Sequence, residues 1–192
     1  MQCRRIRILL ASVKEMYNKV PPLVRTFLLR ALFIFIGWQL LYTLALLPNR
    51  VLDIPLTNAT AWSTAKLMSV FYNSVSVSYI HNLTLATSII SIDGHKVLGI
   101  LDPCNALDIM VLYIAFLLCF PGSVKKRLLF IALGLPYIYI INTIRCAAIG
   151  WMNIAHKGWV DISHHYIFTA LVYLLVFSLW MIYTKKKTPD AA

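Results

Sequence analysis

Four long runs of apolar residues, separated by shorter polar segments, dominate the hydropathy pattern of the chain. They cover about residues 27–48, 104–120, 128–149 and 165–184. A helix needs about 20 mainly apolar residues to cross the hydrocarbon core of a bilayer, which is roughly 30 Å thick. The pattern therefore predicts an all-α polytopic membrane protein with about four transmembrane helices, of which the second is the shortest.

The segment between the first two runs, residues 49–103, has a different pattern. Residues 56–72 repeat apolar side chains at helical spacing, whereas residues 74–100 alternate polar and apolar side chains as a strand does. Asp93-Gly94, within the second stretch, is typical of a tight hairpin turn. We therefore expect a small insertion made of a helix and a β-hairpin. The helix residues predicted to be buried or to lie at a membrane interface are Trp62, Leu67, Val70 and Phe71.

Basic residues are concentrated on one side of this arrangement. Seven Lys or Arg residues precede or begin the first run, three lie between the second and third runs, and three follow the fourth. Cytoplasmic segments of membrane proteins carry an excess of Lys and Arg, so both termini are predicted to be cytoplasmic. The basic residues left for the opposite side are Arg50, Lys66, Lys96, Arg145 and Lys157.

This orientation divides the chain into four parts. Residues 1–26 are basic and are predicted to lie as an amphipathic helix on the anionic cytoplasmic leaflet. Residues 27–48 form the first transmembrane helix, and residues 49–103 form the insertion, which is extracytoplasmic. Residues 104–187 hold the other three helices and all the residues with the strongest chemical signals.

Composition agrees with a bilayer protein and argues against several other classes. Hydrophobic residues make up 60% of the chain and charged residues 13%, too few for a soluble domain of this length. The net charge of +11 lies beside the apolar runs, which indicates membrane orientation rather than nucleic-acid binding. The four cysteines, at positions 3, 104, 119 and 146, form no CxxC pair, so neither a disulfide framework nor a zinc ribbon is expected.

Polar residues at the outer ends of three predicted helices are the candidates for chemistry. Asp102-Pro103 is typical of a helix start, which places Cys104 in the first turn of the second helix, where the helix dipole favours a thiolate. Arg145 lies among apolar residues near the outer end of the third helix, where an arginine is costly and marks a functional site by default. Asn142 shares its helical face and is placed to hold the guanidinium group or a substrate carbonyl.

His164 and His165 begin the fourth helix from the same side. Adjacent helical residues point about 100° apart, so only one of the two faces a given partner. That residue is a candidate general acid or base, or a metal ligand together with His156. Asp108, one turn into the second helix, is a candidate partner of Arg145. A cysteine nucleophile, a histidine base and an arginine that stabilises an oxyanion are the groups that acyl transfer needs.

The ordered motifs Cys104-Asn105-Ala106, Asn142-Thr143-Ile144-Arg145 and His164-His165-Tyr166-Ile167-Phe168 resemble the Cys, Asn-x-x-Arg and His motifs of the exosortase/archaeosortase family. The β-rich approach to the cysteine is similar too, and the resemblance covers about residues 75–185. It implies a bacterial inner-membrane cysteine protease or transpeptidase with its active site on the extracytoplasmic face. Such an enzyme recognises a C-terminal sorting signal (a short motif, a membrane helix and a basic tail), cleaves at the motif through a thioester and transfers the product to an acceptor.

By this resemblance, Cys104 is the nucleophile, Arg145 stabilises the oxyanion or orients the substrate, and His164, or else His165, carries the proton. The supporting residues would be Asn142, Asn105 and Asp108, with no metal, cofactor or nucleic acid involved. Two departures stand out. Ala106 occupies a position where family members commonly have Gly, and the Gly that usually follows the histidine is missing. Larger members have about twice as many membrane helices, so this chain resembles a short variant.

Two non-hydrolytic functions remain open from the residues alone. One is a membrane assembly or accessory subunit, in which Arg145 and the histidines hold a partner helix and Cys104 only packs. The other is a small transporter or proton relay that uses Arg145 and His164/His165 along a polar path. The relay is the weaker of the two, because none of the four runs has an ionisable residue near its midpoint.

Overall fold

The computed structural model describes residues 21–81, 86–155, 158 and 167–185. The basic segment predicted for residues 1–26 therefore lies mostly outside the described residues, as do His164 and His165. The elements in chain order are α2 (Pro22–Leu41), which continues into η1 (Tyr42–Leu46), α3 (Asp53–Met68), β1 (Val75–His81), β2 (Ala86–Ile92), β3 (His95–Leu101), the short 3₁₀ turn η2 (Asp102–Cys104), α4 (Leu107–Cys119), α5 (Val124–Ala155) and α7 (Phe168–Thr184).

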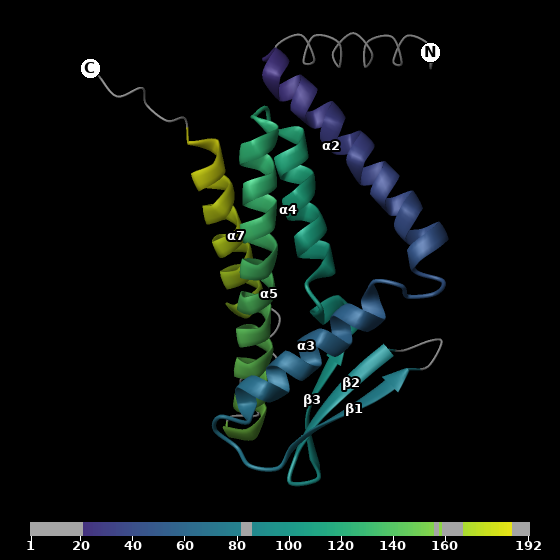
Figure 1. Ribbon diagram of the computed structural model, residues 1–192, viewed down its shortest axis with the longest axis vertical. Helices are drawn as coiled ribbons and strands as arrows, with labels where there is room; N and C mark the ends of the chain where they lie inside the picture. Colours follow the sequence, from purple (N-terminus) through teal and green to yellow (C-terminus); the bar gives the residue numbers. More distant parts are fainter. Residues whose placement is uncertain (1–20, 82–85, 156–157, 159–166, 186–192) are drawn as a thin grey trace, which may run out of the picture.

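Helices α4, α5 and α7 lie side by side, and α2 leans away from them towards its C-terminal end (Figure 1). The core of this bundle is apolar and aromatic, because each helix turns large side chains towards the other two. Tyr113 and Leu117 of α4, Ile138 of α5, and Val172 and Val176 of α7 are almost fully buried there. By contrast α2 contributes little to the core, and most of its large apolar side chains are exposed.

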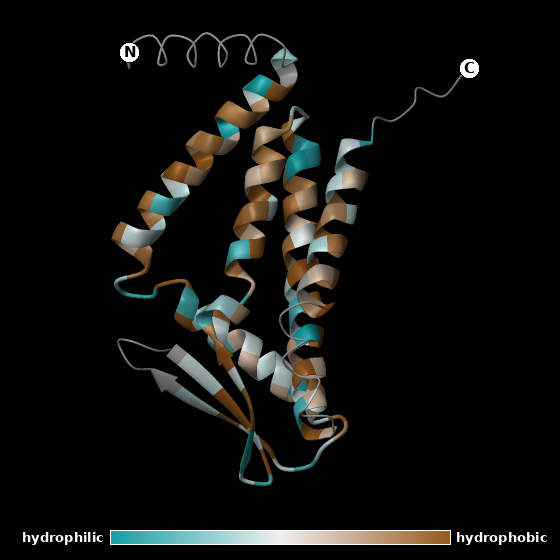
Figure 2. Ribbon diagram, turned by 180° about the vertical axis from the view of Figure 1, so that it is seen from behind, coloured by the Kyte–Doolittle hydropathy of each residue, from teal (hydrophilic) through white to brown (hydrophobic). Residues whose placement is uncertain are grey.

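The outer surfaces of these helices are largely apolar (Figure 2). Two of them are long and apolar enough to cross a membrane, namely residues Val24–Leu46 and Val124–Ala155. The apolar helices Leu107–Cys119 and Ala170–Thr184 are shorter. The 13 residues of α4 extend over about 20 Å, less than the thickness of a bilayer core. The number of four transmembrane helices therefore stays a prediction.

The segment between α2 and α4 folds into α3 and an antiparallel sheet of three strands in the order β1-β2-β3. The sequence predicted two strands here, so the predicted number of strands was wrong. The turn between β2 and β3 consists of Asp93 and Gly94, whose φ angles of 50° and 78° are both positive. Two positive φ angles match the twist of paired strands, and Asp-Gly accepts them at low cost.

The buried face of α3 differs from the predicted one. Trp62, Val70 and Phe71 are 56%, 73% and 78% exposed, so they do not pack in a protein core, although they remain candidates for contact with lipid. The buried face consists instead of small and polar residues: Asp53, Thr57, Thr60, Ala61, Thr64, Ala65 and Met68. Small side chains let α3 approach the sheet and α5 closely.

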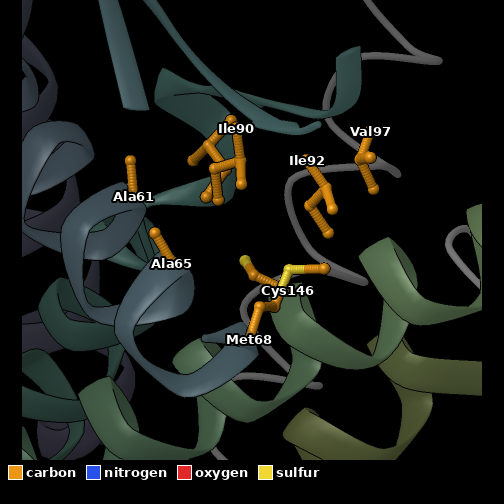
Figure 3. Packing of buried hydrophobic residues seen from close by; sticks show 8 residues of the cluster. Ala61, Ala65, Met68, Ile90, Ile92, Val97 and Cys146 are labelled. Atoms are coloured by element: carbon orange, nitrogen blue, oxygen red, sulfur yellow. The ribbon is translucent and has the colours of Figure 1, made fainter. Parts of the chain in front are cut away.

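A second core joins α3, the sheet and α5 (Figure 3). Ala61, Ala65 and Met68 of α3 meet Ile90 of the sheet and Cys146 of α5. The partly buried side chain of Cys104 packs against this cluster. The outer end of α5 is therefore fixed to the insertion, and the chain that leads from β3 into α4 lies beside it.

Gly134 of α5 allows α4 and α5 to pack closely, because the Tyr113 ring of α4 lies directly against it. A Cβ atom at this position would collide with the ring. The ring cannot easily move, since Tyr113 is fully buried and its hydroxyl group donates a hydrogen bond of 2.9 Å to the carbonyl of Phe130.

We expect Gly134→Ala to lower the free energy of unfolding by about 1–3 kcal/mol, the usual cost of overpacking a core. The thermal unfolding temperature of the detergent-solubilised protein measures this. Gly37→Ala in α2 is the matched control, because no atom lies within 4 Å of a Cβ there. Equal stability of the two variants would contradict the close packing of Tyr113 on α5.

Candidate active site at the cysteine turn

Cys104 ends the 3₁₀ turn η2 and is not part of α4. The helix begins at Leu107, after Ala106, which has a left-handed backbone with φ 66°. The sequence prediction that Cys104 lies in the first turn of the helix is therefore wrong. A left-handed residue cannot continue a right-handed helix, so the chain changes direction between the cysteine and α4.

Asn105 stabilises this change of direction. Its Oδ1 atom accepts a hydrogen bond of 2.8 Å from the backbone N–H of Leu107, one of the amide groups that the start of α4 leaves without a helical partner. Asn105 is only 1% exposed, so the side chain is locked inside the protein. We call residues 102–107 the cysteine turn.

Asn142 connects the cysteine turn to α5. Its Nδ2 atom donates a hydrogen bond of 2.8 Å to the backbone carbonyl of Cys104. Its Oδ1 atom accepts one of 3.4 Å from Nη1 of Arg145, one helical turn further on. Asn142 is fully buried, so this single amide group orders both the cysteine backbone and the guanidinium group. Asn142 was expected to hold either the guanidinium group or a substrate carbonyl. The structure shows the contact with the guanidinium group.

Arg145 has hydrogen-bonding capacity left over. The side chain is partly buried, and its Nε atom is inaccessible to solvent yet has no acceptor among the described residues. A guanidinium group carries five N–H donors in a fixed plane. Nη1 donates to Asn142, and the described residues leave at least the Nε donor without an acceptor.

Cys104 and Cys146 are both thiols at this end of the molecule. Cys146 is buried, and its Sγ atom lies 4.0 Å from the carbonyl oxygen of Cys104. Cys104 is more exposed than Cys146 and than Cys119, which is buried near the end of α4. Of the three described cysteines, Cys104 is therefore the one that an external substrate reaches most easily.

Asp108 does not pair with Arg145. It is exposed and lines a groove of about 520 Å³ between α2, α4 and α7, in which Gln39 is the other strongly polar residue. The groove follows one stripe of α4 from Asp108 through Leu112 and Ala115 to Cys119. Its outer end lies at the start of α4, next to the cysteine turn.

Sequence reasoning missed the residues that hold the cysteine turn from the side of α3. Asp53 accepts a hydrogen bond of 3.2 Å from Asn105, and Thr57 donates one of 3.0 Å to Asp102. A signal was available, because Asp53, Thr57, Thr60 and Thr64 recur at helical spacing and form a polar face.

The predicted proton carriers, His164 and His165, lie outside the described residues, so their roles stay predictions. Within the described ranges there is no group of three His, Cys, Asp or Glu side chains that could hold a metal ion. The described part of the site thus consists of a thiol, a guanidinium group and the amide group that orders them.

The transmembrane exosortase family matches residues 21–187, which is most of the chain. This match confirms the resemblance inferred from the Cys, Asn-x-x-Arg and His motifs. No curated protein and no solved structure matches the chain.

We expect Ala106→Gly to stabilise the protein by about 1 kcal/mol, since glycine adopts a left-handed backbone without the steric cost that alanine pays. The thermal unfolding temperature should rise. Ala148→Gly, in the middle of α5, is the control for the loss of a methyl group. It should lower stability by about 1 kcal/mol, because glycine is a poor helix former. A lower unfolding temperature in both variants would contradict the left-handed backbone at Ala106.

Proposed function

Because the chain belongs to the transmembrane exosortase family, a family of membrane proteases and transpeptidases, we propose that it cleaves exported precursors through Cys104. The substrate would carry a C-terminal sorting signal with a short motif, a membrane helix and a basic tail. The product would be transferred to an acceptor nucleophile. The site would face the extracytoplasmic side of a bacterial inner membrane, with both termini in the cytoplasm.

The reaction follows from the groups at the site. The Cys104 thiolate attacks the carbonyl carbon of the scissile peptide bond, and the carbonyl oxygen becomes an oxyanion. When this intermediate collapses, the C–N bond breaks, and the leaving amine takes a proton from the histidine, which we assign to His164 with His165 as the alternative. The thioester is then attacked by an acceptor amine or by water, which gives a proton back to the histidine as the C–S bond breaks and the thiolate is released.

The observation that carries the proposal is the bridge from Cys104 through Asn142 to Arg145. Through Asn142, the positively charged guanidinium group of Arg145 is held close to the backbone of Cys104. A preorganised donor in a partly buried site stabilises a developing oxyanion more than a solvated one does. The Nε donor of Arg145, which has no acceptor among the described residues, suits this role.

The orientation in the membrane is supported by where the charges lie on the bundle. Lys125, Lys126 and Arg127 begin α5, and Lys126 reaches α7, where its Nζ atom donates a hydrogen bond of 2.6 Å to the carbonyl of Tyr183. This basic end is opposite to the cysteine turn (Figures 1 and 2). Basic clusters favour the cytoplasmic side.

The groove beside α4 is our candidate for binding the membrane helix of the substrate. It is mostly apolar, extends along most of α4 and is bounded by α2, whose Phe27 packs against Phe116 of α4. Because the outer end of the groove meets the cysteine turn, a helix lying in it would present its outer flank to Cys104.

We expect Cys104→Ala to abolish precursor cleavage, because no other group can form the thioester. The assay follows an epitope-tagged precursor with such a C-terminal signal by its shift in mass during co-expression. Arg145→Ala should slow cleavage by about 10²–10³-fold, as the loss of an oxyanion donor does. His164→Ala should also impair cleavage, and His165→Ala tests the alternative proton carrier.

Cys3→Ala is the control for the loss of a thiol, since this residue lies in the basic N-terminal segment that is predicted to be cytoplasmic, on the other side of the membrane from the proposed site. It should cleave normally. Normal cleavage by Cys104→Ala would exclude the enzyme function. If Arg145→Ala at the same time reduced co-purification of partner proteins, the accessory-subunit function would be favoured.

We expect Ala115→Trp to reduce precursor cleavage several-fold, because the indole ring fills the groove where the substrate helix would lie. Leu133→Trp is the matched control on α5, where the side chain is 66% exposed and outside the groove. Pull-down of an uncleaved precursor by the Cys104→Ala protein, with and without each Trp, separates binding from chemistry. Unchanged binding in Ala115→Trp would place the substrate elsewhere.

A further inference from the structure

The connection between α2 and α3 holds the cysteine turn through a chain of buried polar contacts. It comes from residues on both sides of the corner where the chain leaves α2 and enters α3 (Figure 1). We call it the corner network, and its members are Tyr42, Arg50, Asp53 and Thr57 from the corner and Asp102 and Asn105 from the cysteine turn.

Asn105 is the centre of this network, and every polar atom of its side chain is used. Nδ2 donates to Oδ1 of Asp53 and to Oγ1 of Thr57, both at 3.2 Å. Oδ1 accepts from the amide of Leu107 at 2.8 Å. An amide group with all three contacts satisfied has a single orientation, so the residue that follows Cys104 is fixed.

Asp102, two residues before Cys104, is held by the same corner. One carboxylate oxygen accepts a hydrogen bond of 3.0 Å from Thr57, and the other lies 3.4 Å from Nη1 of Arg50. The corner therefore holds the chain on both sides of the cysteine. Asn142 holds the third point, the carbonyl of Cys104 itself.

Asp53 is the unusual member, because it is a carboxyl group with only 2% exposure. Both of its oxygen atoms accept hydrogen bonds, from Tyr42 at 3.0 Å and from Asn105 at 3.2 Å. Burying a charge costs free energy, and apolar residues of similar size often give a more stable protein. Stability alone therefore does not explain this residue.

We propose that Asp53 is a positioning residue for Cys104, which acts by orienting Asn105 and through it the cysteine turn. The inference rests on the proposed function only in naming Cys104 as the nucleophile. Without Asp53, Asn105 loses the partner that sets the direction of its amide group, and the backbone between Cys104 and α4 can take other conformations.

The test is a charge-exchange cycle on the pair Asp53 and Asn105. Asn105→Asp keeps the acceptor for the amide of Leu107 but replaces Nδ2 with a carboxylate oxygen, which can donate neither to Asp53 nor to Thr57. The double variant D53N/N105D re-forms the contact with residue 53 and leaves the one with Thr57 changed. Asp53→Asn should have the smaller effect, because its amide can accept from Asn105 while donating to Tyr42. In the double variant D53N/N105D, an amide again faces a carboxylate with the roles exchanged.

Two rates are measured on the full-length protein: precursor cleavage, and alkylation of Cys104 by iodoacetamide, followed by mass spectrometry of its peptide. We expect N105D to reduce cleavage at least about tenfold and to change the alkylation rate at least about fivefold, and the double variant to return both close to the original values, as coupled residues do. Asn58→Asp is the control variant. It adds one negative charge to α3, on a side chain whose oxygen accepts a hydrogen bond from Ser88. It should leave both rates unchanged.

Three results would overturn the proposal. One is an N105D protein with unchanged alkylation. Another is a double variant whose cleavage and alkylation rates are no closer to the original values than those of N105D. The third is a double variant that restores the yield of folded protein in size-exclusion chromatography but not the alkylation rate, because the contact would then be structural only. If instead Cys104→Ala still cleaves precursors, the proposed function fails, and the alkylation cycle still decides the role of Asp53.

Discussion

The hydrogen bond from Asn142 to the carbonyl of Cys104 is the contact on which the candidate site depends. It joins two segments that lie 38 residues apart in the sequence, the cysteine turn and the C-terminal half of α5. The same side chain receives Nη1 of Arg145. Without this partner, the carbonyl would keep only the weaker contact from the Cys146 thiol, at 4.0 Å. The contact thus stabilises the fold and brings the thiol and the cation to one place.

The insertion has a structural task that its position outside the bundle does not suggest. Its helix α3 turns a polar face of Asp53 and Thr57 to the cysteine turn and an apolar face of Ala61, Ala65 and Met68 to the sheet and α5. The apolar half fixes α3 in place, and the polar half then serves as a rigid support for the turn. A polar contact in such a dry environment has a well-defined geometry, because no water competes for it.

The sequence predicted the features that follow from periodicity and from motif order. Apolar runs located the helices, and the ordered motifs led to the correct family. It did not predict the start of α4, because Asp102-Pro103 begins a 3₁₀ turn as readily as a helix. It did not predict the buried face of α3 either, since threonine counts as polar on a hydropathy scale but is buried here by partners distant in sequence. Such tertiary contacts are invisible to local patterns.

The departure at Ala106 has a physical explanation in the backbone. The resemblance leads to an expected Gly two positions after the cysteine, and in this chain the residue there is Ala106, with φ 66°. Glycine adopts such an angle freely, whereas alanine pays about 1–2 kcal/mol. The contacts of Asn105 with Asp53, Thr57 and Leu107 oppose this cost on the preceding residue. The strained turn and the corner that holds it are therefore two parts of one arrangement, and a chain with alanine here relies on Asn105 more than a chain with glycine would.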